Sequence, residues 1–175
     1  MADVDIKIRE ATIGDAQVLA DIGTNSFRDA YSPHSSMADL ETHISDYFAI
    51  DAVRAELHQT DRNYLLATVN GEAGGIAKFR HAACPVPGGD ANAFELQQLY
   101  VLAEMQGYGL GRQLVKEVVD AARQAGTKGV WLSAWEFADW ATGFYRKSGF
   151  NEIGKVEFKL GSKSFTDLLM WKSLE

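Results

Sequence analysis

The spacing of hydrophobic positions divides the first sixty residues into a strand followed by helices. Ile6 and Ile8 lie on one face of an extended segment, which predicts a strand over residues 5–12. Gly14-Asp15 is typical of a helix start, and hydrophobic residues then follow at helical spacing at Val18, Leu19, Ile22 and Phe27. Residues 37–59 are expected to form one or two short helices, whose apolar stripe consists of Leu40, Ile44, Tyr47, Phe48, Val53 and Leu57.

From Asp61 onward the pattern changes to that of β-strands. Residues 64–69 are rich in β-forming side chains, and Asn70-Gly71 is a strong hairpin signal, so residues 75–80 are expected to form the returning strand. The segment 84–90 contains two prolines and two glycines and is short enough to be a surface loop. A further strand is predicted over residues 94–101.

The remaining chain alternates between helices and strands. An amphipathic helix that Gly126 ends is predicted from Leu110, Leu114, Val118, Ala121, Ala122 and Ala125. A strand over 130–135 and a second helix ended by Gly149 follow. Two last strands, about 150–160 and 164–172, meet at Gly161-Ser162. The order β-α-α-β-β-β-α-β-α-β-β predicts an α/β fold with a mixed sheet.

Length and charge limit the organisation and the partners. The chain has 175 residues, which suits one domain over residues 1–175, because two halves would each struggle to bury a core. Its hydrophobic content of 46% is that of an ordinary globular chain. A net charge of −7 argues against nucleic acid as a partner, because phosphate binding requires a basic surface.

Short apolar runs and a single cysteine bear on the cellular setting. The longest apolar run, Leu99–Ala103, falls far short of the roughly 20 residues that a membrane-spanning helix needs. The acidic start, Met1–Asp5, lacks the apolar region of a signal peptide. Cys84 is the only cysteine and cannot form an internal disulfide. A reducing cytoplasmic setting without membrane attachment is therefore expected.

The segment Gln106-Gly107-Tyr108-Gly109-Leu110-Gly111-Arg112 carries the clearest functional signal. It joins a predicted strand to a predicted helix, and glycine at every second position removes Cβ atoms where a ligand would approach the backbone. The free amides at a helix start attract anions, phosphate above all, although a plain tight turn explains the glycines equally well. A Walker loop is excluded because Arg112-Gln113 follows Gly111, and a dinucleotide fingerprint because the spacing is G-x-G-x-G.

The turn fits the pattern Q/R-x-x-G-x-G/A, as Gln106, Gly109 and Gly111, and with its surroundings it resembles the GNAT (Gcn5-related) N-acetyltransferases. The resemblance covers nearly the whole chain: E-L-Q-Q-L-Y-V, the turn, V-W-L-S-A-W-E, A-x-x-F-Y-R-K-S-G-F and D-L-L-M-W-K. It is greatest to the branch that includes PaiA-type spermidine/spermine acetyltransferases. It implies a central mixed sheet flanked by helices and the use of acetyl-CoA as cosubstrate, with no metal.

The resemblance assigns the cofactor site residue by residue. The backbone amides of Gln106, Gly107, Tyr108, Gly109, Leu110, Gly111 and Arg112 would bind the pyrophosphate of coenzyme A. A bulge at Leu99, Tyr100 and Val101 would separate that strand from the next, so that its backbone could pair with the pantetheine arm. Further cofactor contacts are implied for Asp139 and Lys147. The family often has an asparagine where this chain has Ala138, and Asp139 is expected to cap the helix instead.

Tyr145 stands where the family has its general acid. Thioester aminolysis expels a thiolate, and a phenol with a pKa near 10 can protonate a thiolate whose thiol has a pKa of about 8.5. The alternative is a tyrosine packed in the core, a role that Phe144 beside it could fill alone.

Glu95 matches a glutamate that several family members use as a base. An alkylamine with a pKa of about 10.4 is some three units too basic at pH 7, a cost of roughly 4 kcal/mol, so Glu95 would act through ordered water in a desolvated site. A lone glutamate on a strand is equally often a surface residue or an ion-pair partner.

The other polar residues carry weaker signals. Glu136 could face either substrate or solvent. The four histidines, His34, His43, His58 and His81, have no metal-ligand spacing and are expected at the surface, and Cys84 is expected to be an unreactive thiol.

The resulting hypothesis is an N-acetyltransferase that acetylates a primary amine of a small molecule by direct attack in a ternary complex. A protein or peptide N-acetyltransferase and a non-catalytic acyl-CoA-binding regulator are the alternatives, and a homodimer is compatible with the resemblance. Acidic residues dominate residues 37–56, where the resembled fold has its acceptor groove, which favours a polyamine acceptor. A solvated helix face explains the same acids without any acceptor.

Overall fold

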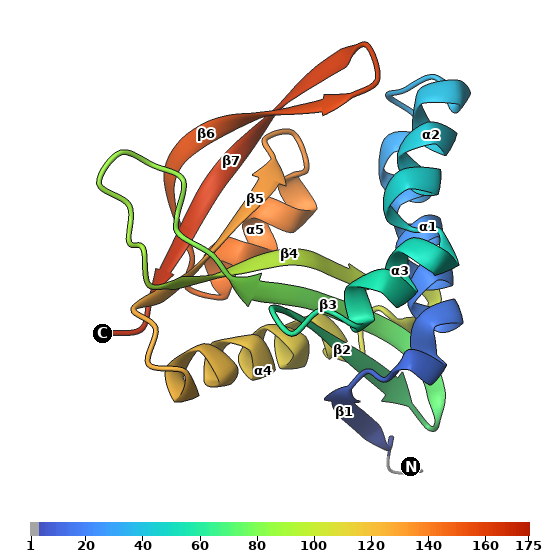
Figure 1. Ribbon diagram of the computed structural model, residues 1–175, viewed down its shortest axis with the longest axis horizontal. Coiled ribbons are helices and arrows are strands. Elements are labelled where there is room, and N and C mark those ends of the chain that lie inside the picture. The colour runs from blue at the N-terminus through green and yellow to red at the C-terminus, as the bar shows by residue number, and fades with distance from the viewer. Residues whose placement is uncertain (1–3) are drawn as a thin grey trace.

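The computed structural model describes residues 4–175, and Met1–Asp3, the first part of the acidic start, lie outside the described residues. Within this range one seven-stranded sheet has the order β1-β2-β3-β4-β5-β7-β6 (Figure 1). The strands are β1 (Ile6–Glu10), β2 (Arg62–Val69), β3 (Glu72–His81), β4 (Ala93–Val101), β5 (Gly129–Trp135), β6 (Asn151–Leu160) and β7 (Lys163–Ser173). Neighbouring strands are antiparallel except for the parallel pair β4 and β5. The predicted mixed sheet is confirmed.

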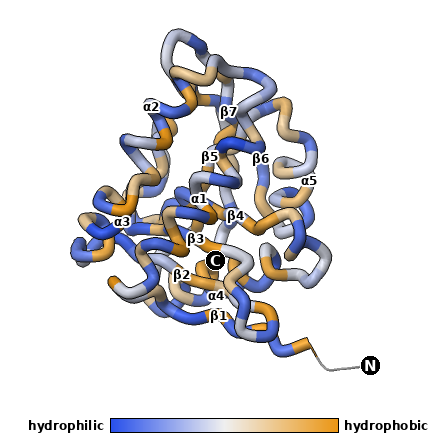
Figure 2. The backbone as a smooth tube through the Cα atoms, turned by 90° about the vertical axis from the view of Figure 1, so that its right-hand side faces the viewer, coloured by the Kyte–Doolittle hydropathy of each residue, from blue (hydrophilic) through white to orange (hydrophobic). Residues whose placement is uncertain are grey.

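The helices lie where the hydrophobic spacing predicts them. They are α1 (Ala16–Tyr31), α2 (Met37–Tyr47), α3 (Ile50–Leu57), α4 (Leu110–Gln124) and α5 (Asp139–Lys147), with short 3-10 turns η1 (Ile13–Asp15) and η2 (Ala103–Met105). The stretch 37–59 forms two helices because the backbone at Ala49 is extended, with φ −60° and ψ 144°. Along the helices hydrophobic residues recur between hydrophilic ones (Figure 2), as expected for helices that cover a sheet.

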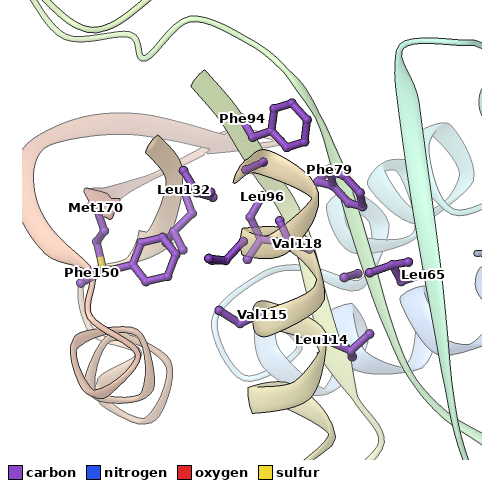
Figure 3. Packing of buried hydrophobic residues seen from close by; sticks show 14 of the residues in the cluster. Leu65, Phe79, Phe94, Leu96, Leu114, Val115, Val118, Leu132, Phe150 and Met170 are labelled. Carbon is purple, nitrogen blue, oxygen red and sulfur yellow. The ribbon is translucent and has the colours of Figure 1, made fainter. Parts of the chain in front are cut away.

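The helices cover the two faces of the sheet unequally. On one face, α4 and the Phe144–Tyr145 part of α5 pack on the largest core cluster. Figure 3 shows Leu114, Val115 and Val118 of α4 directed toward side chains of the sheet such as Leu96 and Leu132. On the other face, α1 and α3 pack on β2 and β3, while α2 packs toward β6 and β7 through a separate aromatic cluster. The second face therefore carries α2 and α3, which contain residues 37–56, the stretch that the family resemblance places beside the acceptor groove.

The β6–β7 hairpin reaches across to the helices of the second face. Its tip lies beside the α1–α2 connection (Figure 1), where Lys163 Nζ donates a hydrogen bond of 2.6 Å to the carbonyl oxygen of His34. Gly161 packs so tightly against the carboxyl group of Asp39 that a Cβ atom there would overlap it. The two segments, far apart in sequence, thus enclose the region between α2 and the sheet.

Candidate active site

The parallel strands β4 and β5 separate in the middle of the sheet. Their pairing covers Ala93–Glu95 opposite Gly129–Trp131, with Glu95 opposite Trp131 as its last pair. Beyond this point β4 pairs with β3 on one side only, so the backbone edge of Leu99–Val101 that faces β5 is free of a strand partner among the described residues. Such an edge offers the hydrogen-bonding groups that an extended ligand can use.

A bulge accompanies the separation, but not where the sequence analysis placed it. Leu99, Tyr100 and Val101 pair regularly with β3, and the irregularity lies between the pairs Lys78–Gln98 and Phe79–Leu96. Gln97 is therefore the extra residue of β4. Because a bulge turns consecutive side chains to one face of the sheet, both Gln97 and Gln98 line the same pocket.

The glycine turn has an exposed, left-handed backbone. Gly107 and Gly109 have φ angles of 91° and 81°, and a Cβ atom at either position would meet no described atom within 4 Å. Gly109 caps α4, whose first amides have no acceptor within the helix and carry its partial positive charge. Gln106, Tyr108 and Arg112 are exposed, whereas the side chain of Leu110 is buried in the core. The turn therefore offers backbone donors in open space.

Gly111 has a different role from the other two glycines. A Cβ atom there would approach Cζ of Phe144 to 3.4 Å, so this glycine lets α4 pack closely on α5. It shows that the glycine pattern combines a helix–helix contact with the open backbone of the turn.

Tyr145 lies half-buried on α5, with its ring 5.3 Å from that of Phe144 and 5.8 Å from that of Phe150. Burial raises the pKa of its phenol above the usual value of 10.0, so the hydroxyl keeps its proton at neutral pH. The pKa of Tyr100 on β4 is also raised, mainly by burial and further by Tyr31 and Tyr145.

Glu95 is held in an ion pair. Its Oε2 atom accepts a hydrogen bond of 2.7 Å from Nε of Arg80, the residue opposite it on β3. The side chain is 16% exposed and lies next to the point where β4 and β5 separate. Glu95 does not line the pocket of about 210 Å³ that lies between α1, α2 and the sheet.

The remaining predicted positions lie on or next to α5. Asp139 is the first residue of this helix rather than its cap, because Ala138 precedes it at the N-cap position with no side-chain cap. The expectation that Asp139 caps the helix is therefore wrong. Asp139 and Lys147 are exposed at opposite ends of α5. Glu136 forms an ion pair of 3.0 Å with Lys155 of β6.

A pocket of about 210 Å³ lies between the helices α1 and α2 and the diverging part of the sheet. Aromatic side chains form most of its walls: Phe27 and Tyr31 from α1, His43 and Tyr47 from α2, and Phe48, Tyr100 and Phe158. His43 stacks on Phe27 with ring centroids 4.4 Å apart, so it is not the surface residue that the sequence analysis expected. Burial lowers its pKa below 6.5, with Asp46 acting in the opposite direction.

Asp167 of β7 supplies the only carboxylate among the described residues that line the pocket. The residue is 7% exposed, and its Oδ1 atom is buried without a hydrogen-bond partner in the range 4–175. Burial raises the pKa of this carboxyl to about 6, against a smaller lowering by Ser133. Sequence reasoning missed Asp167, although a single acid in the apolar run 165–171 was a usable signal.

The acidic residues of 37–56 lie elsewhere. Glu41 is paired with Arg28 at 2.8 Å, and Glu56 with Lys78 at 2.6 Å. Helix α2 does border the pocket, but through aromatic side chains instead of its acids. None of the acidic residues of 37–56 is among the described residues that line the pocket.

Three further features bear on other functions. Cys84 is buried in a small cluster with Trp131 and Leu169, and burial raises the pKa of its thiol. Residues 4–175 contain no group of three His, Cys, Asp or Glu side chains arranged to hold a metal ion. None of the described helices combines the length and the apolar character needed to cross a membrane.

Known proteins share both the sequence and the fold. An uncharacterized N-acetyltransferase of Lactobacillus delbrueckii subsp. lactis is 25% identical over 169 residues, which cover 97% of this chain and 98% of that protein. An uncharacterized N-acetyltransferase of Mycobacterium tuberculosis is 34% identical over 86 residues, 49% of this chain and 55% of that protein.

Solved structures with this fold include the PaiA N-acetyltransferase of Thermoplasma acidophilum in complex with coenzyme A. Its TM-score is 0.79 at 22% identity, over 97% of this chain and 99% of that chain. The ribosomal-protein-alanine N-acetyltransferase of Brucella melitensis has a TM-score of 0.68 at 23% identity, over 96% and 99%. At these identities the likeness establishes the fold.

The family is established by the sequence itself. Residues 24–150, most of the chain, match the sequence model of the Acetyltransferase (GNAT) family. The chain therefore belongs to the GNAT family and is an acetyl-CoA-dependent N-acetyltransferase.

Proposed function

We propose that residues 1–175 form one catalytic domain that transfers the acetyl group of acetyl-CoA to a primary amine of a small molecule. The observation that carries this proposal is the separation of β4 from β5 directly beside the open turn at the start of α4. A free strand edge and a cluster of unpaired helix amides are the two features that an extended, phosphorylated cofactor needs. The reaction would proceed by direct attack in a ternary complex.

The cofactor would lie along the turn and the free edge. The amides from Gln106 to Arg112 would bind the pyrophosphate, and the backbone of Leu99–Val101 would pair with the pantetheine arm. Asp139 and Lys147, at the two ends of α5, would make further contacts with the cofactor. The open space at Gly107 and Gly109 supports this placement, because phosphate oxygens must approach these amides closely.

Two residues would handle the protons. The amine nitrogen attacks the thioester carbonyl, the C–S bond breaks, and the thiolate leaves with the electron pair. Tyr145, which burial keeps in its protonated form, would donate a hydrogen bond and then a proton to this sulfur. Glu95, fixed by Arg80, would accept a proton of the amine through an ordered water molecule.

The acceptor would be a small amine, with polyamines among the candidates. A pocket of about 210 Å³ is smaller than the roughly 300–1,000 Å³ of ordinary ligand sites, so it admits one end of a slender molecule. The PaiA protein of similar fold supports including spermidine and spermine in any substrate panel. We propose that the enzyme acts in the reducing cytoplasm. A homodimer is a separate prediction, and a measurement of the molar mass by light scattering tests it.

Release of free coenzyme A thiol, followed during incubation with acetyl-CoA and single amines, tests the proposal. The panel should contain alkylamines, polyamines, arylalkylamines, aminoglycosides, amino acids and short peptides, with products identified by mass spectrometry. Acetylation of small amines is the expected result. Turnover of peptides alone would establish the protein-acetyltransferase alternative, and acetyl-CoA binding without turnover of any amine would establish the non-catalytic one.

A further inference from the structure

Asp167 carries the one carboxylate among the described residues that line the acceptor pocket, and neither the fold nor the proposed proton transfers account for it. The residue is 7% exposed, and its Oδ1 atom is buried without a hydrogen-bond partner in the described part of the chain. Ser133 on β5 also lines the pocket and lowers the pKa of the carboxyl group, against the larger effect of burial. A buried carboxylate with so few partners destabilises the fold unless something else compensates its charge.

Cations on α1, which borders the pocket, and on β3 are paired with acids that do not line the pocket. Arg80 pairs with Glu95 at 2.7 Å, and Lys78 pairs with Glu56 at 2.6 Å. On the helix side, Arg28 pairs with Glu41 at 2.8 Å. No lysine or arginine occurs among the described residues that line the pocket. The compensating positive charge is therefore expected to come from outside the protein.

The walls around Asp167 are suited to a cation that carries apolar carbon. The ring of Tyr31 lies 5.5 Å from that of Phe165 and 5.8 Å from that of Phe158, and His43 lies 4.4 Å from Phe27. Aromatic faces attract ammonium groups and pack against carbon chains at the same time. A carboxylate among aromatic pocket walls thus matches a primary ammonium group on a hydrophobic skeleton.

We propose that Asp167 anchors the acceptor as it arrives in its ammonium form, and that the acceptor is a primary amine on an apolar carbon skeleton with no carboxylate beside the amine. The ammonium group loses one proton to solvent, and the neutral nitrogen keeps a hydrogen bond to Asp167 while it attacks the thioester and passes its second proton toward Glu95. This inference rests on the proposed function and narrows its substrate class. An α-amino acid places its own carboxylate next to the amine, and two like charges in a desolvated pocket repel strongly. Removal of the carboxylate from the same skeleton removes the repulsion and keeps the shape.

Matched substrate pairs test the inference on the wild-type enzyme. Phenethylamine is compared with phenylalanine, and 3-methylbutylamine with leucine, by measuring kcat/KM at saturating acetyl-CoA. We expect at least one of these amines to be acetylated, with a kcat/KM about 100-fold or more above that of its amino acid. Equal values within each pair would overturn the inference, because Asp167 would then exert no selection against the carboxylate.

The isosteric variant Asp167→Asn tests the anchor itself. Loss of one charge-assisted hydrogen bond corresponds to a rise in KM for the amine of about 10–100-fold. An anchor that acts equally on substrate and transition state leaves kcat within about threefold, and the Kd for acetyl-CoA should not change. A fall in kcat at unchanged KM would overturn the anchoring role, as would an unchanged KM and kcat.

Glu41→Gln is the matched control, because it removes one negative charge from α2 at a residue outside the pocket lining. Its KM should stay at the wild-type value. If circular dichroism shows that Asp167→Asn does not fold, the comparison of amines with their amino acids on the wild-type enzyme still tests the inference. Binding of acetyl-CoA without turnover of any amine would reject the proposed function as a whole, whereas turnover without discrimination rejects this inference alone.

Discussion

Nε of Arg80 lies 2.7 Å from Oε2 of Glu95, across a directly opposed pair of residues on β3 and β4. The ion pair fixes the glutamate at the position where β4 and β5 part. Sequence reasoning offered a water-mediated base and an ion-pair partner as competing roles for Glu95. The structure establishes the ion pair, and the two roles are compatible, because a positioned base needs a fixed orientation.

Glu95→Gln is expected to lower kcat by about 10²-fold or more, since general base catalysis contributes about 10²–10⁴-fold. Steady-state kinetics at saturating acetyl-CoA measures this, with binding of acetyl-CoA unchanged. Glu136→Gln, which breaks the ion pair with Lys155, is the control and should retain the wild-type kcat. Wild-type turnover in Glu95→Gln would leave Glu95 with its ion-pair role only.

Tyr145→Phe removes one hydroxyl and keeps the ring that packs near Phe144 and Phe150. If the phenol protonates the leaving thiolate, kcat should fall by about 10²–10⁴-fold, while the KM for acetyl-CoA and the Tm change little. Tyr64→Phe, which removes a buried hydroxyl that donates to Glu56 outside the pocket lining, is the matched control and should keep the wild-type kcat. Unchanged turnover in Tyr145→Phe would assign Tyr145 to core packing.

The buried carboxyl of Asp167 should make the fold less stable as pH rises. Its pKa is about 6 in the folded protein and about 3.9 in an unfolded chain, so between these values the folded state binds more protons. The free energy of unfolding therefore falls through this window, by up to about 3 kcal/mol for this group. Asp167→Asn removes the dependence.

Urea unfolding of both proteins between pH 4 and pH 8 measures this effect as a difference, in which other groups such as Asp15 cancel. We expect the stability of Asp167→Asn relative to wild type to rise as pH increases from about 4 to about 7 and then to level off. A difference that does not vary with pH would show that Asp167 titrates in the folded protein as it does in the unfolded chain.

Amine binding should weaken in acid for the same reason. Below a pH of about 6 the carboxyl of Asp167 becomes neutral, and the KM for the amine should rise in wild type but not in Asp167→Asn. The other titratable groups that face the pocket are Tyr31, His43, Tyr47 and Tyr100. His43 has a pKa lowered below 6.5 and could also titrate in this range. The variant His43→Gln removes that contribution and should still show the rise in KM below a pH of about 6. Loss of that rise in His43→Gln would assign it to the histidine.

The regular elements were predictable because each carries its own periodic pattern. The amphipathic spacing from Leu110 to Ala125 gave α4, and the hairpin signal at Asn70-Gly71 joined β2 to β3 as expected. The strand-to-helix turn was predictable for a similar reason, since glycines at 107 and 109 are required by the positive φ angles that the backbone adopts there.

The pocket that contains Asp167 was not predictable, because it depends on pairings between distant segments. Asp167 faces the pocket because β7 pairs with β5 in a register that sets it opposite Trp135. The bulge at Gln97 depends likewise on the pairing of β3 with β4, which local sequence does not specify. The ion pairs of Glu41 and Glu56 were not predictable either, because their partners, Arg28 and Lys78, lie on other elements.

We propose that acetyl-CoA binds with its phosphates on the turn at the start of α4. Isothermal titration of acetyl-CoA into the variant Gly109→Glu tests this placement most directly. Gly126→Glu is the matched control, because Gly126 has a similar φ of 70°, lies just beyond the other end of α4 and also has open space where a Cβ would stand. Both variants place a glutamate at a positive φ angle and add one negative charge. We predict that Gly126→Glu binds acetyl-CoA as the wild type does, while Gly109→Glu loses at least about 100-fold in affinity through charge repulsion with the pyrophosphate. Wild-type affinity in a folded Gly109→Glu variant would contradict the claim.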